Sequence, residues 1–157
     1  MTACFIIDGM LGGLSRWLRI LGFDTIYYVD KDDEELKIEA KKSERILVTR
    51  DHELYRQAKN QNINAILIQS EQTVEQLQEL VELLDLSLTP KNTRCPKCNN
   101  LINPVDKELI SDKVPPESFN AFEEYWICSN CGAVYWKGSH WEQILKTLEN
   151  IDTSKYL

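Results

Sequence analysis

Acidic residues follow three apolar segments in the first half of this sequence. Asp8 ends "FIID", Asp51 and Glu53 follow "ILVTR", and a run of acids follows "TIYYV". The members of that run are Asp30, Asp32, Asp33 and Glu34. If the three segments are parallel neighbouring strands, their carboxyl ends meet at one edge of a sheet, where ligands bind in such folds. Carboxylates gathered there repel one another unless a cation offsets them, and Mg²⁺ or Mn²⁺ suits oxygen ligands. The sequence therefore predicts a site at which one or two divalent ions bind a phosphate and activate a water.

Each acid also has a purely structural explanation. Asp51 stands where the N-cap of a helix belongs, and Asp33 fits the first turn of another helix. Glu53 could be solvated surface. Asp8 is harder to explain in this way, because it ends an apolar strand just before the glycine-rich "GMLGG". The joint placement of the acids after successive strands, more than any single acid, favours a metal site.

Three arginines near these acids could hold the phosphates of a substrate. Arg16 and Arg19 lie three residues apart on a predicted helix just after Asp8, and Arg50 adjoins Asp51. Residues three apart lie on the same side of a helix, and arginine is a common phosphate ligand. The alternatives are a solvated helix face for Arg16 and Arg19, and an ion pair with a neighbouring acid for Arg50.

The second half of the chain carries two Cys-x-x-Cys units, "CPKC" and "CSNC". Four thiolates can surround one tetrahedral Zn²⁺, and such a closed site is structural because no position stays open for chemistry. The predicted zinc ligands are Cys95, Cys98, Cys128 and Cys131. Asn99 and Gly132 directly follow the two units, and both residue types tolerate the left-handed backbone that such turns favour. "EYWIC" and "AVYW" predict a hairpin, as in a zinc ribbon; the alternatives are redox-active or unpaired thiols, or iron.

The elements that must position these residues alternate along the first half of the chain. Apolar and β-branched segments predict strands at 3–8, 25–29, 45–49 and 65–69. Amphipathic segments predict helices at 10–22, 33–42, 52–60 and 73–84. Near-continuous apolar strands joined by helices predict an α/β fold, with a parallel sheet covered by helices on both faces.

The composition changes at 85–94, which predicts a domain boundary. We expect an α/β domain over residues 1–88, and a zinc ribbon with a C-terminal helix over residues 89–157. The amphipathic pattern at 140–150 predicts that helix.

Charge and hydropathy limit the function classes. The formal net charge of −7 disfavours nonspecific wrapping of nucleic acid, although it does not exclude a nucleic-acid enzyme that holds metal ions with carboxylates. No apolar run reaches the length of about 18 residues that a membrane span needs. The N-terminal "MTACFIIDGM" lacks the pattern of a secretory signal. We therefore expect a cytoplasmic protein without a membrane partner, in which cysteines serve as metal ligands or free thiols.

Several of these motifs together resemble the Mut-seven C-terminal RNase family, a branch of the PIN-like nucleases with an appended zinc ribbon. The matching stretches are "FIIDGMLGGLSRWLRILGFDT", "DDEEL", "ILVTRDHEL", the two cysteine pairs and "VYWKGSHW". The resemblance covers nearly the whole chain. It implies a PIN-like α/β fold and metal-dependent ribonuclease activity on an RNA substrate.

The resemblance also implies roles for individual acids. Asp8 matches the acid of the first strand, Asp33 best matches the second acid and Asp51 matches the third, all as ligands of a catalytic Mg²⁺ or Mn²⁺. Glu53 stands at the place of a further catalytic acid. The second assignment remains open among the adjacent acids Asp32, Asp33 and Glu34.

Two other function classes remain open. The chain could be a non-catalytic module that binds RNA or a protein through the PIN-like scaffold and the ribbon, which the absence of a basic patch in the sequence favours. It could also be a phosphohydrolase that acts on nucleotides.

Overall fold

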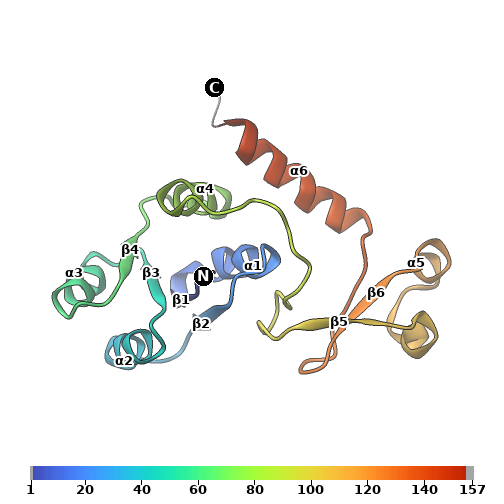
Figure 1. The fold of residues 1–157 in the computed structure, drawn as a ribbon, viewed down its shortest axis with the longest axis horizontal. Coiled ribbons are helices and arrows are strands. Elements are labelled where there is room, and N and C mark those ends of the chain that lie inside the picture. Colours follow the sequence, from blue (N-terminus) through green and yellow to red (C-terminus); the bar gives the residue numbers. More distant parts are fainter. Residues whose placement is uncertain (1, 155–157) are drawn as a thin grey trace.

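A parallel sheet forms the centre of the computed structural model, which describes residues 2–154 (Figure 1). Its strands are β1 (Phe5–Asp8), β2 (Thr25–Tyr28), β3 (Ile46–Thr49) and β4 (Ala65–Leu67), in the order β2-β1-β3-β4. All three pairings are parallel, so every carboxyl end lies at the same edge. The predicted α/β fold is confirmed, and β1 with its terminal Asp8 lies between β2 and β3.

Helices cover both faces of this sheet. They are α1 (Gly12–Ile20), which follows a 3-10 turn at Gly9–Leu11, α2 (Asp33–Ser43), α3 (His52–Asn60) and α4 (Thr73–Leu84). Side chains alternate along β1: Phe5 and Ile7 pack with α1 and α4, while Ile6 packs with α2 and α3. Both faces of β1 are apolar because both are covered, as is usual for parallel sheets.

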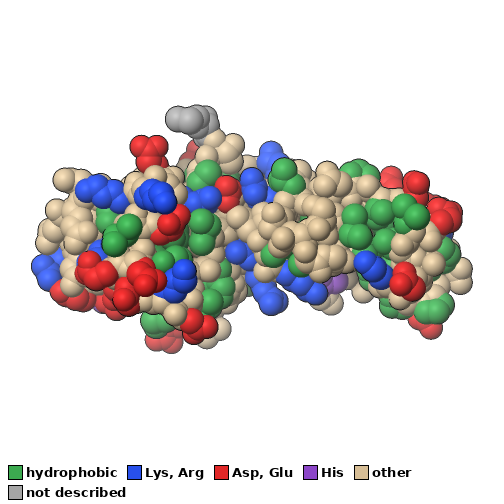
Figure 2. Space-filling model, turned by 90° about the horizontal axis from the view of Figure 1, so that it is seen from below, with side chains coloured by type: hydrophobic (Ala, Val, Ile, Leu, Met, Phe, Trp, Pro, Cys, Tyr) green, Lys and Arg blue, Asp and Glu red, His purple; other side chains and the backbone are tan. Residues whose placement is uncertain are grey.

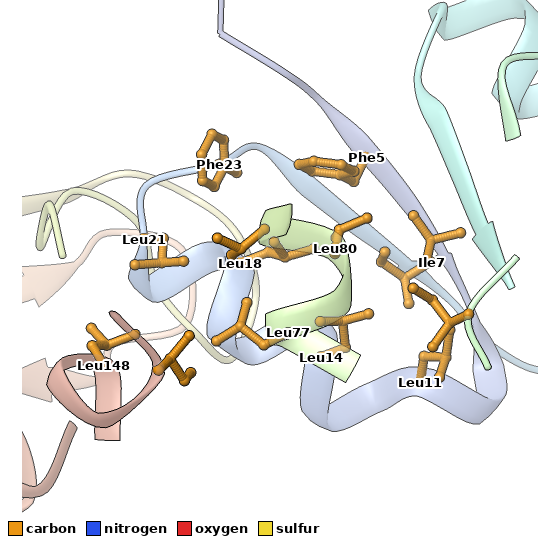
Figure 3. Packing of buried hydrophobic residues seen from close by; sticks show 14 of the residues in the cluster. Phe5, Ile7, Leu11, Leu14, Leu18, Leu21, Phe23, Leu77, Leu80 and Leu148 are labelled. Carbon is orange, nitrogen blue, oxygen red and sulfur yellow. The ribbon is translucent and has the colours of Figure 1, made fainter. Parts of the chain in front are cut away.

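The larger core lies between the sheet, α1 and α4 (Figure 3). Leu14, Leu18 and Leu21 recur at helical spacing along one side of α1 and meet Leu77 and Leu80 of α4. Each of these leucines is at most 1% exposed. Because full burial of a leucine contributes about 1.5–3 kcal/mol, this seam holds α1 firmly behind Asp8.

The second sheet is antiparallel and has the order β5-β6-β7. Its strands are β5 (Ile102–Val105), β6 (Tyr125–Cys128) and β7 (Val134–Tyr135). A 3-10 segment (Lys107–Lys113) and a short helix, α5 (Pro116–Ala121), are inserted between β5 and β6. These strands and the two cysteine turns beside them are called the ribbon below.

The last helix, α6 (Ser139–Ser154), leaves the ribbon and returns towards α4 (Figure 1). Its Ile144, Leu148 and Ile151 join the core cluster that contains α1 and α4. The boundary predicted near residue 88 therefore separates the two sheets, whereas the helix that we grouped with the ribbon shares the core of the α/β unit. Neither α6 nor any other helix of the described residues is long and apolar enough to cross a membrane.

Arg19 fastens the ribbon to the α/β unit. It is only 7% exposed, its Nε donates to the carbonyl oxygen of Thr25 at 3.0 Å, and its Nη1 donates to that of Pro96 at 3.0 Å. Burial lowers the pKa of Arg19, while the nearby Cys98 and Cys95 raise it. The alternative of a solvated helix face is therefore wrong for Arg19, whereas a contact of Arg19 with substrate phosphate stays a prediction.

Asp24 forms the centre of a second set of contacts across the same junction. Its Oδ1 accepts hydrogen bonds from Asn99 Nδ2 at 2.7 Å and Arg45 Nη1 at 3.0 Å. Burial raises the pKa of Asp24. The hydrogen bonds from Arg45 and Asn99 and the charges of Arg45 and Arg94 lower this pKa by more than burial raises it, so the net shift is downward. The side chain of Asn99 also accepts from the backbone of Thr25 at 2.9 Å, which completes a polar junction between β2 and the first cysteine turn.

Replacing Arg19 by methionine is expected to destabilise the chain by about 1.5–3 kcal/mol, since it leaves two carbonyl acceptors without a charged donor. Urea unfolding followed by tryptophan fluorescence measures the loss. Arg16→Met is the matched control, because Arg16 is exposed and lies one turn earlier on the same helix. Equal stability of the two variants would contradict the junction role of Arg19.

Candidate metal centres

Thr49 connects two of the predicted acids. This fully buried residue ends β3, and its Oγ1 donates to Asp8 Oδ2 at 2.8 Å and accepts from the backbone N–H of Asp51 at 3.0 Å. Asp8 and Asp51 therefore lie side by side at the carboxyl ends of neighbouring strands. The sequence reasoning did not single out Thr49; the available signal was a hydroxyl residue that ends an otherwise apolar strand two positions before an acid.

Asp51 also caps α3. Its Oδ1 accepts from the backbone N–H groups of Glu53 at 2.9 Å and Leu54 at 3.1 Å. The structural explanation for Asp51 is thus correct, and it is compatible with a place in the site, because the cap fixes the carboxylate at the edge where Asp8 ends.

Asp33 is the acid from the run after β2 that is electrostatically coupled to the other two. Burial raises its pKa, and the negative charges of Asp51 and Asp8 raise it further, against the opposing effect of Lys37. The adjacent acids have other partners. Asp32 Oδ1 caps α2 by accepting from the backbone of Glu35 at 2.8 Å, and Glu34 pairs with Lys37. Asp8, Asp33 and Asp51 are called the acidic edge below.

Glu53 forms hydrogen bonds with other side chains of α3. Its carboxylate is exposed on α3 and accepts from the guanidinium of Arg56 and from Gln57 Nε2 at 3.0 Å. The hydrogen bonds from Arg56 and Gln57 lower the pKa of Glu53 to about 2. Glu53 is thus an ion-pairing residue on the surface of α3 in this structure, and its role as a further catalytic acid stays a prediction.

A buried lysine adds positive charge beside the acids. Lys37 is 2% exposed, and its Nζ donates to Glu34 Oε1 at 2.6 Å and to Gln57 Oε1 at 2.7 Å. A buried ammonium group is tolerated only when it is paired in this way. Its charge lowers the pKa of both Asp33 and Glu53, so it offsets part of the repulsion at the acidic edge. Lys37 is a second residue that the sequence reasoning missed.

The donor set of the acidic edge fits a hard cation. It consists of carboxylate oxygens whose charges act against one another, which is the environment that Mg²⁺ and Mn²⁺ relieve. The carboxylate oxygens of the acidic edge lie farther apart than the cysteine sulfurs. Within residues 2–154, the four cysteines are the one group of three or more His, Cys, Asp or Glu residues whose ligand atoms lie close enough together to hold an ion.

The other predicted arginines have different surroundings. Arg16 is exposed on α1. Arg50 is partly buried, and its Nε is buried without a hydrogen-bond partner among the described residues. The ion pair that we considered for Arg50 does not form within that part of the chain.

The four paired cysteines converge at the end of the ribbon. Cys98 Sγ lies 3.4 Å from Cys128 Sγ, Cys95 Sγ lies 3.6 Å from Cys131 Sγ, and all four sulfurs lie within 4.8 Å of one another. A tetrahedral ion with metal–sulfur bonds of about 2.3 Å places its sulfurs about 3.8 Å apart, so the cluster could bind a structural metal such as zinc.

The two cysteine turns have the same construction. The backbone N–H of Asn99 donates to the carbonyl of Cys95 at 2.8 Å, and that of Gly132 donates to the carbonyl of Cys128 at 2.9 Å. Asn99 has a φ of 74° and Gly132 a φ of 78°, as we expected for residues that directly follow the pairs. Tyr135 adds a hydroxyl 2.9 Å from Cys95 Sγ. Burial, followed by the hydrogen bond with Cys95, raises the pKa of Tyr135.

A protein-family model matches nearly the whole chain. The model described as "Mut7-C RNAse domain" matches residues 3–148, which include the acidic edge and all four paired cysteines. A search of curated proteins found no match. The description of the family model indicates a nuclease-like role.

Proposed function

Because the chain belongs to the Mut7-C RNAse domain family, we propose that it is a metal-dependent ribonuclease that hydrolyses RNA phosphodiester bonds at the acidic edge. The observation that carries the proposal is the pair of hydrogen bonds of Thr49, which places Asp8 and Asp51 together within electrostatic reach of Asp33. A solvated helix face or a simple N-cap needs no such convergence from three separate segments.

The three acids of the acidic edge and two residues beside them each have a role in this proposal. Asp8, Asp33 and Asp51 would hold Mg²⁺ or Mn²⁺, which supplies Lewis acidity for the phosphate and a more acidic water as the nucleophile. Thr49 orients the Asp8 carboxylate through its hydrogen bond. Lys37 limits the repulsion among the acids, but its Nζ is already bonded to Glu34 and Gln57. A divalent ion would offset the negative charge that Lys37 leaves.

The ribbon has a structural role in the same proposal. Its cysteines would bind one Zn²⁺, because four thiolates are the donor set of closed zinc sites. Arg19 and Asn99 link the first cysteine turn to β2, so the ribbon is held in a defined position beside α1 and extends the surface available to RNA. A cytoplasmic location remains a prediction.

A non-catalytic RNA-binding module is the second candidate, favoured by the wider spacing of the carboxylates compared with the cysteines. Incubation with Mn²⁺ and either labelled single-stranded RNA or nucleoside triphosphates separates the three possibilities. We expect shortened RNA and intact nucleotides. RNA that is bound but never shortened would favour the module, and phosphate release from nucleotides would favour the phosphohydrolase.

Replacing Thr49 by valine is expected to reduce RNA cleavage roughly 10- to 100-fold, the usual effect of removing a side chain that orients a metal ligand. The valine keeps the shape of the buried side chain but cannot donate to Asp8. Rates with saturating Mn²⁺ measure the effect.

Thr25→Val is the matched control for this variant. Thr25 is also fully buried at a strand, but its Oγ1 donates to the backbone of Phe23 at 2.9 Å, away from the acids. Thr49→Val loses two hydrogen bonds and Thr25→Val loses one, each worth about 1 kcal/mol, so the two variants should differ in stability by only about 1 kcal/mol. Equal cleavage by the two variants would contradict a positioning role for Thr49.

A further inference from the structure

A cleft of about 350 Å³ lies where α1, the ribbon and α6 meet. Three of the four tryptophans in the chain line it: Trp17 from α1, Trp136 from the segment after β7, and Trp141 from α6. All three are partly buried, so each indole has both packed and solvent-accessible surface. The proposed cleavage chemistry uses none of them.

The cleft is basic although the chain is acidic. Arg16, Arg94, Lys97 and His140 line it, and none of its described lining residues is Asp or Glu. The chain as a whole has 25 acidic residues against 18 Lys and Arg. Figure 2 shows one face on which Lys, Arg and His side chains lie along the middle, where Asp and Glu are few, whereas Asp and Glu gather towards the two ends and are mixed with Lys and Arg at one of them. The cleft therefore complements a polyanion.

A second depression adjoins this cleft. It shares Gly13, Arg16 and Lys97 with the cleft and extends to Tyr27. The hydroxyl of Tyr27 donates to the carbonyl of Gly9, the residue that follows Asp8. The basic surface thus leads from the tryptophans towards the carboxyl end of β1.

The tryptophans are suited to nucleobases. Base stacking on an aromatic side chain is largely independent of sequence, and basic side chains around it bind the phosphates. Lys137 brings a further positive charge to this region, since its Nζ lies 5.7 Å from the ring centroid of Trp141. A base inside a duplex is already stacked and paired, so a cleft of this kind discriminates in favour of unpaired RNA.

We propose that this cleft binds single-stranded RNA, with an unpaired base stacked in the tryptophan-lined pocket and its phosphates on Arg16 and Lys97. The inference rests on the proposed ribonuclease function and adds to it a preference for unpaired RNA. The RNA then runs from the cleft along the shared basic surface to the acidic edge.

Binding is tested with the full chain carrying Asp8→Asn, so that cleavage does not interfere. Fluorescence anisotropy measures the affinity for a short labelled single-stranded RNA and for the duplex of the same sequence. Three proteins are compared, all with Asp8→Asn: one with no change in the cleft, one with Trp141→Leu and one with Lys97→Glu. Trp141→Leu should weaken single-strand binding roughly 5- to 150-fold, as expected for the loss of one stacked base. Quenching of tryptophan fluorescence by the single strand should also decrease.

Lys97→Glu tests RNA binding by the cleft independently, in case Trp141→Leu disturbs the core against which Trp141 packs. Lys97 is exposed, and Lys146→Glu is the matched control, because Lys146 is an exposed residue of α6 that does not line the cleft. We expect Lys97→Glu to weaken single-strand binding and to reduce its dependence on salt, whereas Lys146→Glu has little effect.

Three results would overturn the inference: equal affinity for single strand and duplex, equal effects of the two lysine variants, or no RNA binding at all, which would leave the cleft to a protein partner. The two proposals fail separately. Cleavage by the wild type with no effect of Lys97→Glu on binding removes the cleft site alone. Cleft-dependent binding by a wild type that never cleaves RNA removes the ribonuclease proposal alone.

Discussion

Replacing Asp8 by asparagine is expected to lower the rate of RNA cleavage on the order of a thousandfold, because a metal ion contributes several kcal/mol of transition-state stabilisation. Asp8 ends the central strand and is the acid that Thr49 holds in place. Asparagine has the same shape, and its oxygen can still accept the hydrogen bond of Thr49. The fold should therefore remain intact while the negative charge is lost.

Asp30→Asn is the matched control for this variant. Asp30 belongs to the same acid-rich region and is exposed, and its φ of 61° suits asparagine as well as aspartate. Both variants remove one negative charge near the acidic edge. Initial rates with Mn²⁺ and labelled RNA measure the difference, and an Asp8→Asn rate equal to that of Asp30→Asn would exclude Asp8 as a metal ligand.

Replacing Cys128 by serine is expected to abolish zinc binding and to unfold the ribbon. Cys128 is fully buried, and the apolar cluster around it contains few other buried residues, Cys95 and Ile102. Apparent binding free energies of about 10–16 kcal/mol in zinc-finger peptides show that metal binding dominates the stability of such small units. The junction made by Arg19 and Asn99 with the first cysteine turn should loosen as well.

Elemental analysis and hydrogen exchange of β5 and β6 measure this effect. We expect one zinc per wild-type chain, close to none in Cys128→Ser, and fast exchange of the two strands in the variant. Cys4→Ser is the matched control, since Cys4 precedes β1, lies outside the cluster of four cysteines, and donates from its Sγ to the carbonyl of Thr2 at 3.8 Å. Full zinc content in Cys128→Ser, or iron in the wild type, would refute the zinc assignment.

Local sequence patterns were sufficient to predict the elements that carry the site. The strands and helices of the first half appear close to their expected positions because apolar periodicity and capping act over a few residues. The same holds for the cysteine turns, where the spacing of the pairs and the left-handed Asn99 and Gly132 are local features. Asp51 has both a local and a long-range role: it caps α3, and it lies beside Asp8 from another strand.

Contacts between distant segments could not be predicted in this way. The helical pattern placed Arg19 on the polar side of α1, but Arg19 itself is buried and donates to the carbonyl of Pro96, far along the chain. Thr49 and Lys37 have no distinctive sequence motif, and their importance depends on the neighbours Asp8 and Gln57. The tryptophan cleft likewise exists only because α6 returns to the α/β core.

The most direct test of the central claim is the Mn²⁺ dependence of RNA cleavage by zinc-loaded wild-type protein and by Asp51→Asn. Asparagine caps a helix as well as aspartate does, so this variant keeps the cap of α3 and removes the charge. The account predicts wild-type cleavage that requires Mn²⁺, saturates with it and is lost in Asp51→Asn. Cleavage that persists undiminished in Asp51→Asn, or a wild type that leaves RNA intact at every Mn²⁺ concentration, would contradict it.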